Sequence, residues 1–365
     1  MLKIDKDSPR PFYLQLKEEL KSAIASGQFQ PNDPIPEERK LATDLELSRM
    51  TVRRAIMELT AEGLFQRIRG RGTFVAGPRN KGKTRKAGAK ATAGIVMPFG
   101  QAELRQSFFY YRILESLQEA SGELGLALSF HTITPPIEKF ARDLVGDASL
   151  DALVILGIVD QRLLKLLCQQ GLPAVLVDSA QAEGLPPSDY VSHTSEESAY
   201  RAVLHLLELG HRDIAMLSYG PTPAALEREA GYTRALFTRG IRVRPERLVR
   251  TECNGAGAYA ATRNLLKDAL PTALFCGSDE MALGALSAIK DQGLRVPQDL
   301  SLIGFGDLGY FSQPALSSVR IPVEAIGRKA AEILRARIDA PNASVVRHVF
   351  TCEFIARASS DLPRA

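Results

Sequence analysis

Short apolar runs alternate with helical patterns through most of the chain. From residue 93 onward, apolar runs of strand length are separated by stretches in which apolar residues recur every three or four positions. The clearest runs lie at residues 93–97, 126–130, 151–156, 173–178, 190–192, 214–218, 273–278 and 300–307. Strand, helix and strand repeated in this order predict parallel sheets covered by helices on both faces. About eleven strands favour two doubly wound lobes over one wide sheet.

The first 78 residues follow a different pattern. Helical periodicity covers residues 13–27, 35–46 and 49–62, and two short strands follow at residues 64–68 and 73–75. A glycine-rich tip with two arginines, RGRG, joins the strands. Two helices joined by a short turn and followed by a hairpin predict a helix-turn-helix with a wing.

The third helix of this part opens with arginine. Ser48 stands at the N-cap position and Val52 begins the apolar stripe, so Arg49 lies in the first turn and Arg53 one turn further on. A cation at this end of a helix lies at the positive end of the helix dipole. The arrangement makes sense if the exposed helix end enters the major groove of DNA, where arginines bind guanine edges or phosphates.

The neighbouring elements carry basic and hydroxyl groups in matching places. Thr51 offers a second hydroxyl beside Arg49, and Arg39 begins the preceding helix, where it would meet the DNA backbone. Arg69 and Arg71 on the narrow hairpin tip suit a minor groove or its flanking phosphates. A surface amphipathic helix with fortuitous charge would not explain arginine at both helix starts and at the hairpin tip.

Charge is unevenly distributed along the chain. Residues 1–90 contain 19 Lys or Arg and 11 Asp or Glu, whereas the net charge of all 365 residues is only +4. A basic N-terminal quarter predicts a small module that binds a polyanion, joined to a mildly acidic second part. Residues 79–92 hold six basic residues and no acid, which predicts a flexible linker.

Several classes of protein are disfavoured by what the sequence lacks. No apolar run is long enough to span a bilayer, and no apolar signal segment is visible, so we expect a cytoplasmic protein with no membrane partner. The five histidines have no metal-ligand spacing, and the four cysteines form no CxxC pair. No nucleophile-elbow or phosphate-loop motif occurs either. We therefore expect neither an enzyme nor a metal site, and no cofactor.

Motifs between residues 10 and 76 resemble the GntR-type winged helix. The matching segments are PFYLQL (11–16), IPEERKLA (35–42), SRMTVRRA (48–55), LTAEGL (59–64) and GRGTFV (70–75). The resemblance implies that the DNA-contacting positions are Arg39, Ser48, Arg49, Thr51, Arg53 and Gly70. It also implies that two copies bind a near-palindromic site on double-stranded DNA as a homodimer.

Residues 93–357 resemble the periplasmic-binding-protein-like core of LacI/GalR-type regulators. The matching segments are LGHR (209–212), RxxGY (228–232), SDEMALGA (278–285), GLRVPxDLS (293–301), IGFGD (303–307) and PxL (314–316). A winged helix joined to this core resembles the arabinose-type repressors. The implied architecture is an α/β protein with a DNA-binding domain at 1–78, a linker at 79–92 and an effector domain at 93–365. Its lobe one covers about 93–191 and 318–345, and its lobe two about 192–317 and 346–357.

A small-molecule effector is expected in the crevice between these lobes, at the carboxyl ends of the strands. The resemblance implies that Asp178, Arg228, Ser278 and Gly306 occupy effector-contacting positions. Two further residues, Phe108 and Phe109, would either stack on a sugar face or pack between the lobes.

Two departures from the family pattern affect this site. The family usually has Asn-Asp at positions 278–279 and Asp-Asp at positions 306–307, so Ser278 and Gly306 lack groups that hold sugar hydroxyls. Asp307 is placed to substitute for the missing carboxylate. The two departures argue against an ordinary free sugar, so we expect a sugar-related metabolite, with a smaller, differently polar or anionic ligand as an alternative.

These features together predict a transcriptional regulator that binds specific DNA and is controlled by a small molecule, and the resemblance implies repression. One alternative is a regulator whose altered cleft senses no small molecule. Another is a cytosolic ligand-binding receptor, although such a protein would not need a basic winged helix.

Overall fold

The computed structural model divides the chain into two compact units, one built mainly on residues 1–89 and the other on residues 90–165 and 173–365. It describes residues 4–6, 8–25, 28–29, 33–62, 64–68, 72–75, 90–98, 107–147, 149–157, 159–168, 172–178, 188–268, 270–307, 312–341 and 343–364. Of the predicted hairpin tip at 69–72, only Gly72 is described, and most of the predicted linker at 79–92 also lies outside these ranges.

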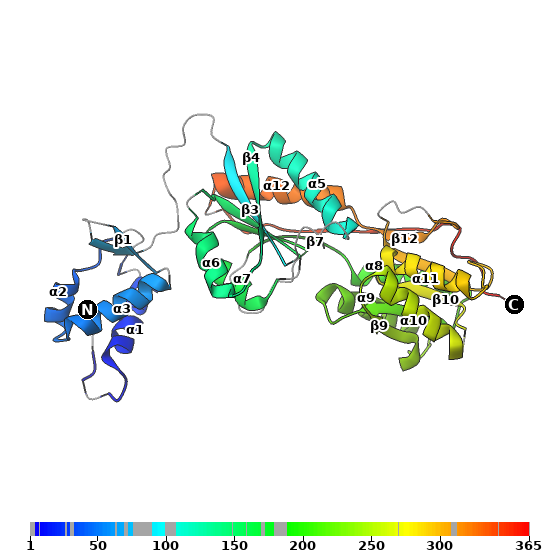
Figure 1. Ribbon diagram of the computed structural model, residues 1–365, viewed down its shortest axis with the longest axis horizontal. Coiled ribbons are helices and arrows are strands. Elements are labelled where there is room, and N and C mark those ends of the chain that lie inside the picture. The colour runs from blue at the N-terminus through cyan, green and yellow to red at the C-terminus, as the bar shows by residue number, and fades with distance from the viewer. Residues whose placement is uncertain are drawn as a thin grey trace. The chain divides into compact units, whose positions relative to one another are not determined.

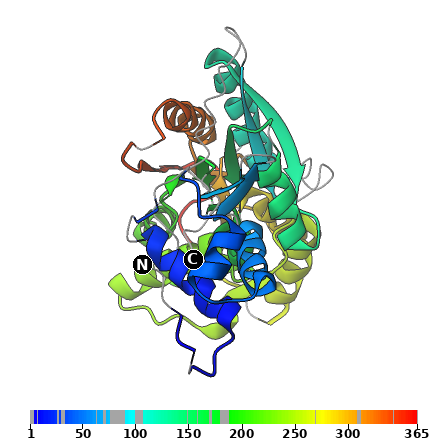
Figure 2. The ribbon, with the colours of Figure 1, turned by 90° about the vertical axis from the view of Figure 1, so that its left-hand side faces the viewer.

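The first unit is a three-helix core with a hairpin. Its elements are α1 (Phe12–Ala25), α2 (Glu38–Asp44), α3 (Arg49–Ala61), β1 (Phe65–Ile68) and β2 (Gly72–Val75). The strands pair antiparallel, and the helices appear in blue in Figure 2. Leu16 and Leu20 of α1 pack fully buried against Val52 and Leu59 of α3. The predicted helix-turn-helix with a wing is confirmed.

Lobe one of the second unit is a parallel sheet with helices on both faces. Its strands are β3 (Ala91–Met97), β4 (Leu126–Thr132), β5 (Ala152–Leu156), β6 (Ala174–Val177), β7 (Asp189–His193) and β13 (Arg347–Phe350), in the order β13-β7-β6-β5-β3-β4. In Figure 1, α5 (Phe108–Glu123) and α12 (Val323–Asp339) cover one face, while α6 (Ile137–Gly146) and α7 (Gln161–Cys168) cover the other.

Lobe two repeats this arrangement. Its strands are β8 (Ile214–Tyr219), β9 (Leu248–Thr251), β10 (Ala273–Cys276), β11 (Ser301–Gly306), β12 (Ser317–Arg320) and β14 (Glu353–Ile355), in the order β14-β12-β11-β10-β8-β9. Only β14 runs antiparallel to its neighbour. The helices pair as α8 (Glu196–Glu208) with α9 (Pro223–Thr238), and α10 (Gly255–Asp268) with α11 (Asp279–Asp291); a short 3-10 helix η1 (Pro245–Arg247) precedes β9.

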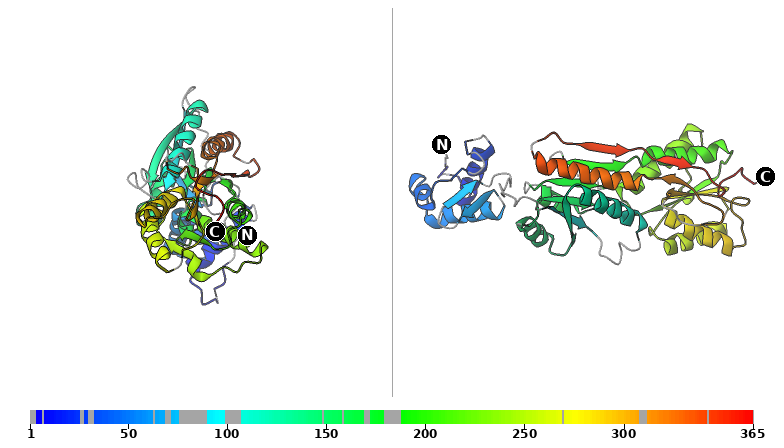
Figure 3. Two further views of the ribbon diagram at one scale, coloured as in Figure 1. Left: turned by 90° about the vertical axis from the view of Figure 1, so that its right-hand side faces the viewer. Right: turned by 90° about the horizontal axis from the view of Figure 1, so that it is seen from above.

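The chain passes between the two lobes three times. The crossings follow β7, β12 and β13, and the last of them, from β13 to β14, is the red segment in the right-hand view of Figure 3. Two predicted lobe boundaries are therefore displaced: the chain leaves lobe two after Arg320 rather than at 318, and it leaves lobe one after Phe350 rather than at 346. The strands SSVR and RHVF mix polar and apolar residues, so pairing with their neighbours decides where they belong.

Candidate DNA interface and ligand site

The N-terminus of α3 is held by its own hydroxyl groups. Ser48 Oγ accepts a hydrogen bond from the backbone N–H of Thr51 at 3.0 Å, as an N-cap does. The Thr51 hydroxyl lies 2.7 Å from the same oxygen. These bonds fix the first turn of α3, and the predicted N-cap role of Ser48 is confirmed.

Several cations of the first unit are neutralised by acidic neighbours. Lys17 of α1 binds Glu58 of α3 at 3.0 Å. Arg54 donates to the same carboxylate at 3.2 Å, and its guanidinium carbon lies 3.7 Å from the centre of the Tyr13 ring. These cations tie α1 to α3, so their function is structural.

A second set of cations is exposed and has no acidic partner within the described part of the unit. The set consists of Arg39, Lys40, Arg49 and Arg53. Arg39 and Lys40 lie in the first turn of α2, and Arg49 opens α3. Glu38 accompanies the cations in the first turn of α2, whereas the first turn of α3 contains no acid, so Arg49 lies at an electropositive helix end that favours an anion. The geometry suits phosphates. Of the other predicted DNA contacts, Arg69, Gly70 and Arg71 fall outside the described residues.

In the second unit, Arg228 of α9 is buried where both lobes meet. It is only 6% exposed. Its Nη1 donates to the Tyr219 hydroxyl at 2.8 Å and to the Gly277 carbonyl at 2.6 Å. The guanidinium lies 3.9 Å from the centre of the Phe305 ring. Its Nε is buried with no hydrogen-bond partner among the described atoms. A buried, unused donor is costly, and a ligand acceptor would satisfy it.

Asp178 lies on the lobe-one side of the same place, directly after β6. Its backbone has φ of 49°, a conformation that non-glycine residues seldom adopt outside turns and functional sites. Its carboxylate accepts a hydrogen bond from the Tyr110 hydroxyl at 3.1 Å. Gly157 makes room for that tyrosine, because a Cβ there would lie 3.1 Å from the hydroxyl oxygen. Burial raises the pKa of Asp178 to about 6, although Arg228 nearby acts in the opposite direction.

His193, at the end of β7, completes the polar part of this cluster. Its Nδ1 lies 3.7 Å from the Asp178 carboxylate, beyond hydrogen-bond distance, and has no partner among the described residues. Burial lowers the pKa of His193 to about 3, and the charge of Arg228 acts in the same direction. The imidazole is therefore neutral at physiological pH and leaves a second buried polar atom unused.

Aromatic rings surround these polar groups. The Phe109 ring centre lies 6.1 Å from that of His193, which lies 6.5 Å from that of Phe305. Apolar ring faces beside a few convergent polar atoms are typical of small-molecule sites. The cleft cluster is defined here as Phe109, Tyr110, Asp178, His193, Tyr219, Arg228 and Phe305.

The remaining predicted effector residues lie at strand ends around this cluster and have structural tasks of their own. Ser278 caps α11 by accepting from the Met281 backbone N–H at 3.2 Å. Gly306 has φ of 140°, which favours glycine and accounts for the missing carboxylate. Asp307 binds Arg320 and Arg357, each at 2.7 Å.

Phe108 faces a different way from Phe109. Its ring stacks with that of Tyr111, with 6.3 Å between ring centres, and lies beside Arg112. Sequence reasoning did not identify Tyr110, His193 or Phe305. His193 ends a strand, so the rule that ligands bind beyond strand carboxyl ends could have found it.

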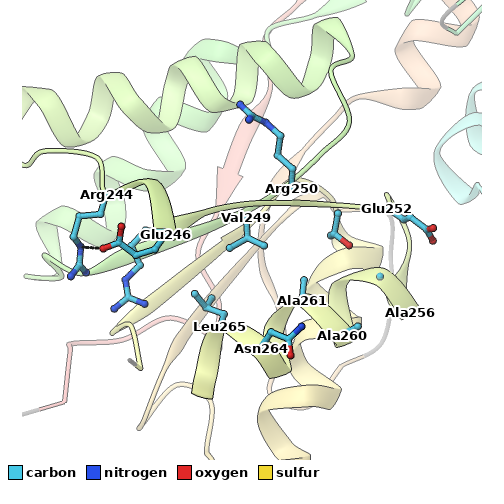
Figure 4. A pocket seen from close by; sticks show the side chains of 13 residues that line it. Arg244, Glu246, Val249, Arg250, Glu252, Ala256, Ala260, Ala261, Asn264 and Leu265 are labelled. Carbon is cyan, nitrogen blue, oxygen red and sulfur yellow. Dashed lines mark ion pairs between the residues drawn. The ribbon is translucent and has the colours of Figure 1, made fainter. Parts of the chain in front are cut away.

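A separate hollow of about 760 Å³ lies between β9 and α10 in lobe two (Figure 4). Val249, Ala261 and Leu265 form its apolar floor, and Arg250 points away from them. The nearby arginines are paired: Arg244 and Arg247 bind Asp213, and Arg250 binds Glu229 at 2.6 Å. These arginines are therefore already neutralised by acids of the same lobe.

No group of three or more His, Cys, Asp or Glu in the described ranges is arranged to hold a metal ion. No helix of the part that the structure describes is long and apolar enough to cross a membrane. A winged helix with unpaired arginines and a two-lobed domain with a buried polar cluster define a DNA-binding regulator with a ligand domain.

Comparisons with known proteins identify the family. The bacterial regulatory proteins of the gntR family match residues 12–75, and the periplasmic binding protein-like domain matches residues 203–360. The arabinose metabolism transcriptional repressor of Geobacillus stearothermophilus is 31% identical over 349 residues, covering 92% of this chain and 93% of the relative. The HTH-type transcriptional repressor CytR of Escherichia coli K12 is 35% identical over 229 residues, covering 61% of this chain and 66% of the relative.

A solved structure, the transcriptional regulator CelR in complex with cellobiose, superposes with a TM-score of 0.69 at 27% identity and covers 85% of this chain and 90% of its own. The chain belongs to the family of bacterial transcriptional repressors that join a gntR-type DNA-binding domain to a periplasmic-binding-protein-like domain. The resemblance inferred from the sequence motifs is confirmed.

Proposed function

We propose that this regulator is a homodimeric repressor whose affinity for DNA changes when the cleft cluster binds a small polyhydroxylated ligand. The observation that carries the proposal is Arg228: a buried cation with an unused donor, facing Asp178 across the junction of the lobes. Burial of such groups without hydrogen-bond partners is unfavourable, so we expect a ligand to supply those partners.

The DNA-binding part of the proposal rests on the first unit. Arg49 and Arg53 enter the major groove from the N-terminal half of α3, with the Ser48 and Thr51 hydroxyls beside them. Arg39 binds the flanking backbone, and the hairpin tip, with Arg69, Gly70 and Arg71, lies along the minor groove. A two-fold dimer would place two such units on a near-palindromic site.

The ligand part follows from the chemistry of the cluster. Asp178 accepts hydrogen bonds, Arg228 and neutral His193 each bring a buried nitrogen that lacks a partner among the described residues, and the half-buried ring of Phe109 suits a sugar face. Relatives include an arabinose metabolism repressor and the PurR and CytR repressors, and a similar solved structure is the complex of CelR with cellobiose. We infer a sugar or a nucleoside as the ligand class.

The remaining effector positions act less directly in this proposal. Ser278 adjoins Gly277, whose carbonyl holds Arg228, so it shapes the cluster through α11. Asp307 is occupied by two arginines and supports the lobe junction rather than the ligand. Phe108 is the first residue of α5, and Gly306 sets the conformation of the end of β11.

The test begins with selection of binding sequences by the full-length protein from a random duplex library. A consensus with two inverted halves is expected, with affinity that falls steeply as salt rises. Thermal shifts with pentoses, disaccharides and nucleosides then identify the ligand, since ligand at one hundred times its Kd adds about 2.7 kcal/mol. Failure to select any sequence would refute DNA recognition. A panel without a shift would favour a cleft that senses no small molecule.

A further inference from the structure

The exposed face of α3 carries methionine as well as arginine. Met50 is 72% exposed and Met57 is 58% exposed. With Phe12 and Tyr13 of α1 they border an open hollow of about 840 Å³. Single exposed apolar residues are common, but two long ones on one helix face beside an aromatic pair indicate a surface that meets a partner.

The charges around this surface indicate which partner it meets. Arg53 lines the hollow and Arg49 lies one turn earlier on α3, both exposed and without an acidic partner in the described part of the unit. Glu58 also lines the hollow, but Lys17 and Arg54 already bind its carboxylate. A protein or membrane partner would need to supply acids to match them, whereas DNA supplies phosphates along its whole length. The surface therefore fits DNA.

Met50 has the right chemistry and the right place for one feature of DNA. It lies in the first turn of α3, between Arg49 and Thr51, and first-turn residues of such a helix meet base edges. Arginine and hydroxyl groups bind polar base edges, but the thymine C5-methyl is the apolar group of the major groove. A flexible thioether packs well against a methyl group.

We propose that Met50 contacts a thymine C5-methyl in each half-site and so determines part of the sequence preference. This inference rests on the proposed DNA recognition by α3. Met57 lies seven residues further along α3, roughly 10 Å from Met50 along the helix axis, and does not reach this methyl. Met57 is therefore the matched control.

The test uses the full-length protein and a duplex obtained by selection from a random library. Each thymine is replaced in turn by deoxyuridine, which pairs in the same way and lacks only the methyl. We expect one position per half-site at which the wild-type protein binds about fourfold more weakly, the effect of exposing one buried methyl group. Met50→Ala should bind the thymine and deoxyuridine duplexes equally at that position, and Met57→Ala should keep the wild-type difference.

Three outcomes overturn the inference. Wild-type binding that is insensitive to deoxyuridine at every position, while Arg49→Ala still weakens binding, removes the methyl contact and leaves the proposed function standing. An unchanged deoxyuridine effect in Met50→Ala assigns the contact to another residue. A change of oligomeric state in Met50→Ala, measured by sedimentation velocity, makes the surface a contact between copies. Failure to select any duplex would instead refute the proposed function itself.

Discussion

Arg49 and Arg54 lie on the same helix, five positions apart, and their surroundings give them different functions. Arg54 is tied to Glu58 and Tyr13, so its charge is satisfied within the unit. Arg49 is exposed at the helix start and its charge is unmatched by any acid that the structure describes. A count of basic residues does not separate the two, but their contacts do.

The first prediction concerns this pair. Arg49→Ala should weaken binding to the selected duplex by about 1–3 kcal/mol and relax the preference at one base pair, because a bidentate base contact is lost. Arg54→Ala should lower the stability of the first unit and leave the base preference unchanged. Fluorescence anisotropy with matched and mismatched duplexes measures both. An equal loss of base preference in the two variants would mean that the face of α3 that carries Arg49 is not the face that contacts DNA.

Asp178 and His193 give the ligand domain a defined dependence on pH. The pKa of Asp178 is raised to about 6, so its folded state binds a proton more tightly than its unfolded state does. Its contribution to stability is complete below pH 4 and is lost as pH rises through 6. The pKa of His193 is lowered to about 3, so its contribution is present above pH 6.5 and is lost as pH falls.

The second prediction follows from the raised pKa of Asp178. Asp178→Asn removes the cost of burying an ionised carboxylate. The unfolding free energy of this variant minus that of the wild type should therefore rise by up to about 3 kcal/mol between pH 4 and 7 and then level off. Urea titrations across this range measure the difference. A difference between Asp178→Asn and wild type that does not vary with pH would mean that Asp178 is well solvated.

At the scale of elements, three helix pairs depend on a glycine at their contact. A Cβ at Gly231 would lie 2.2 Å from the Glu196 carbonyl oxygen of α8, and one at Gly327 would lie 2.5 Å from the Ile113 carbonyl oxygen of α5. In α11, a Cβ at Gly284 would lie 2.1 Å from the Gly255 carbonyl oxygen of α10. Backbone atoms cannot move aside as side chains can, so these helices approach closely only because glycine is present.

The third prediction uses Gly284. Gly284→Ala should destabilise the second unit by at least about 1–3 kcal/mol, because α10 and α11 must separate. Gly122 lies in α5, and a Cβ added there would meet no atom within 4 Å, so Gly122→Ala should be neutral or stabilising by up to about 1 kcal/mol. Chemical denaturation measures both. Similar effects of the two substitutions would show that α10 and α11 do not pack this closely.

The sequence pattern located most central strands and the edge strand β4, but it missed the central strand β12 and the other three edge strands. Strands such as β5, with ALVIL, are buried along their whole length and appear as continuous apolar runs. The edge strands β9, β13 and β14 are short and partly exposed, with LVRT, RHVF and EFI, so they carry no such run. Their place depends on pairing with strands far away in the chain, which local periodicity does not encode.

The cleft cluster shows the same division. The family motifs predict Asp178 and Arg228, and both lie in it. They do not predict Tyr110 or His193, because Tyr110 lies within an ordinary amphipathic helix and His193 ends a strand with no motif. Tyr110, Asp178 and His193 lie beside Arg228 only because lobe one packs on lobe two. The sequence pattern does not specify how the two lobes pack.

At the scale of the whole molecule, the proposed function requires that ligand binding changes DNA affinity. In this proposal the two lobes, joined by three chain crossings, move as bodies, and a ligand that binds one arrangement more tightly shifts the population. The change in each lobe would pass to the DNA-binding units through the dimer. Such coupling is a free energy between two sites, of about 1–3 kcal/mol in comparable systems.

The fourth prediction separates the two sites. Arg228→Ala should abolish the thermal shift caused by the ligand and leave affinity for the selected duplex within about twofold of wild type, since Arg228 belongs to the second unit alone. Arg263→Ala, on α10, should change neither. Loss of both functions in Arg228→Ala would point to a folding role for the buried guanidinium.

The most direct test of the proposed function is a single titration. Full-length protein is bound to its selected duplex, and fluorescence anisotropy is followed as pentoses, disaccharides and nucleosides are added. We expect one class of compound to change the affinity for DNA by about five- to 150-fold in the wild type and to have no effect in Arg228→Ala. If the duplex is bound tightly but no compound changes its affinity, the cleft cluster does not control DNA binding and the central claim is wrong.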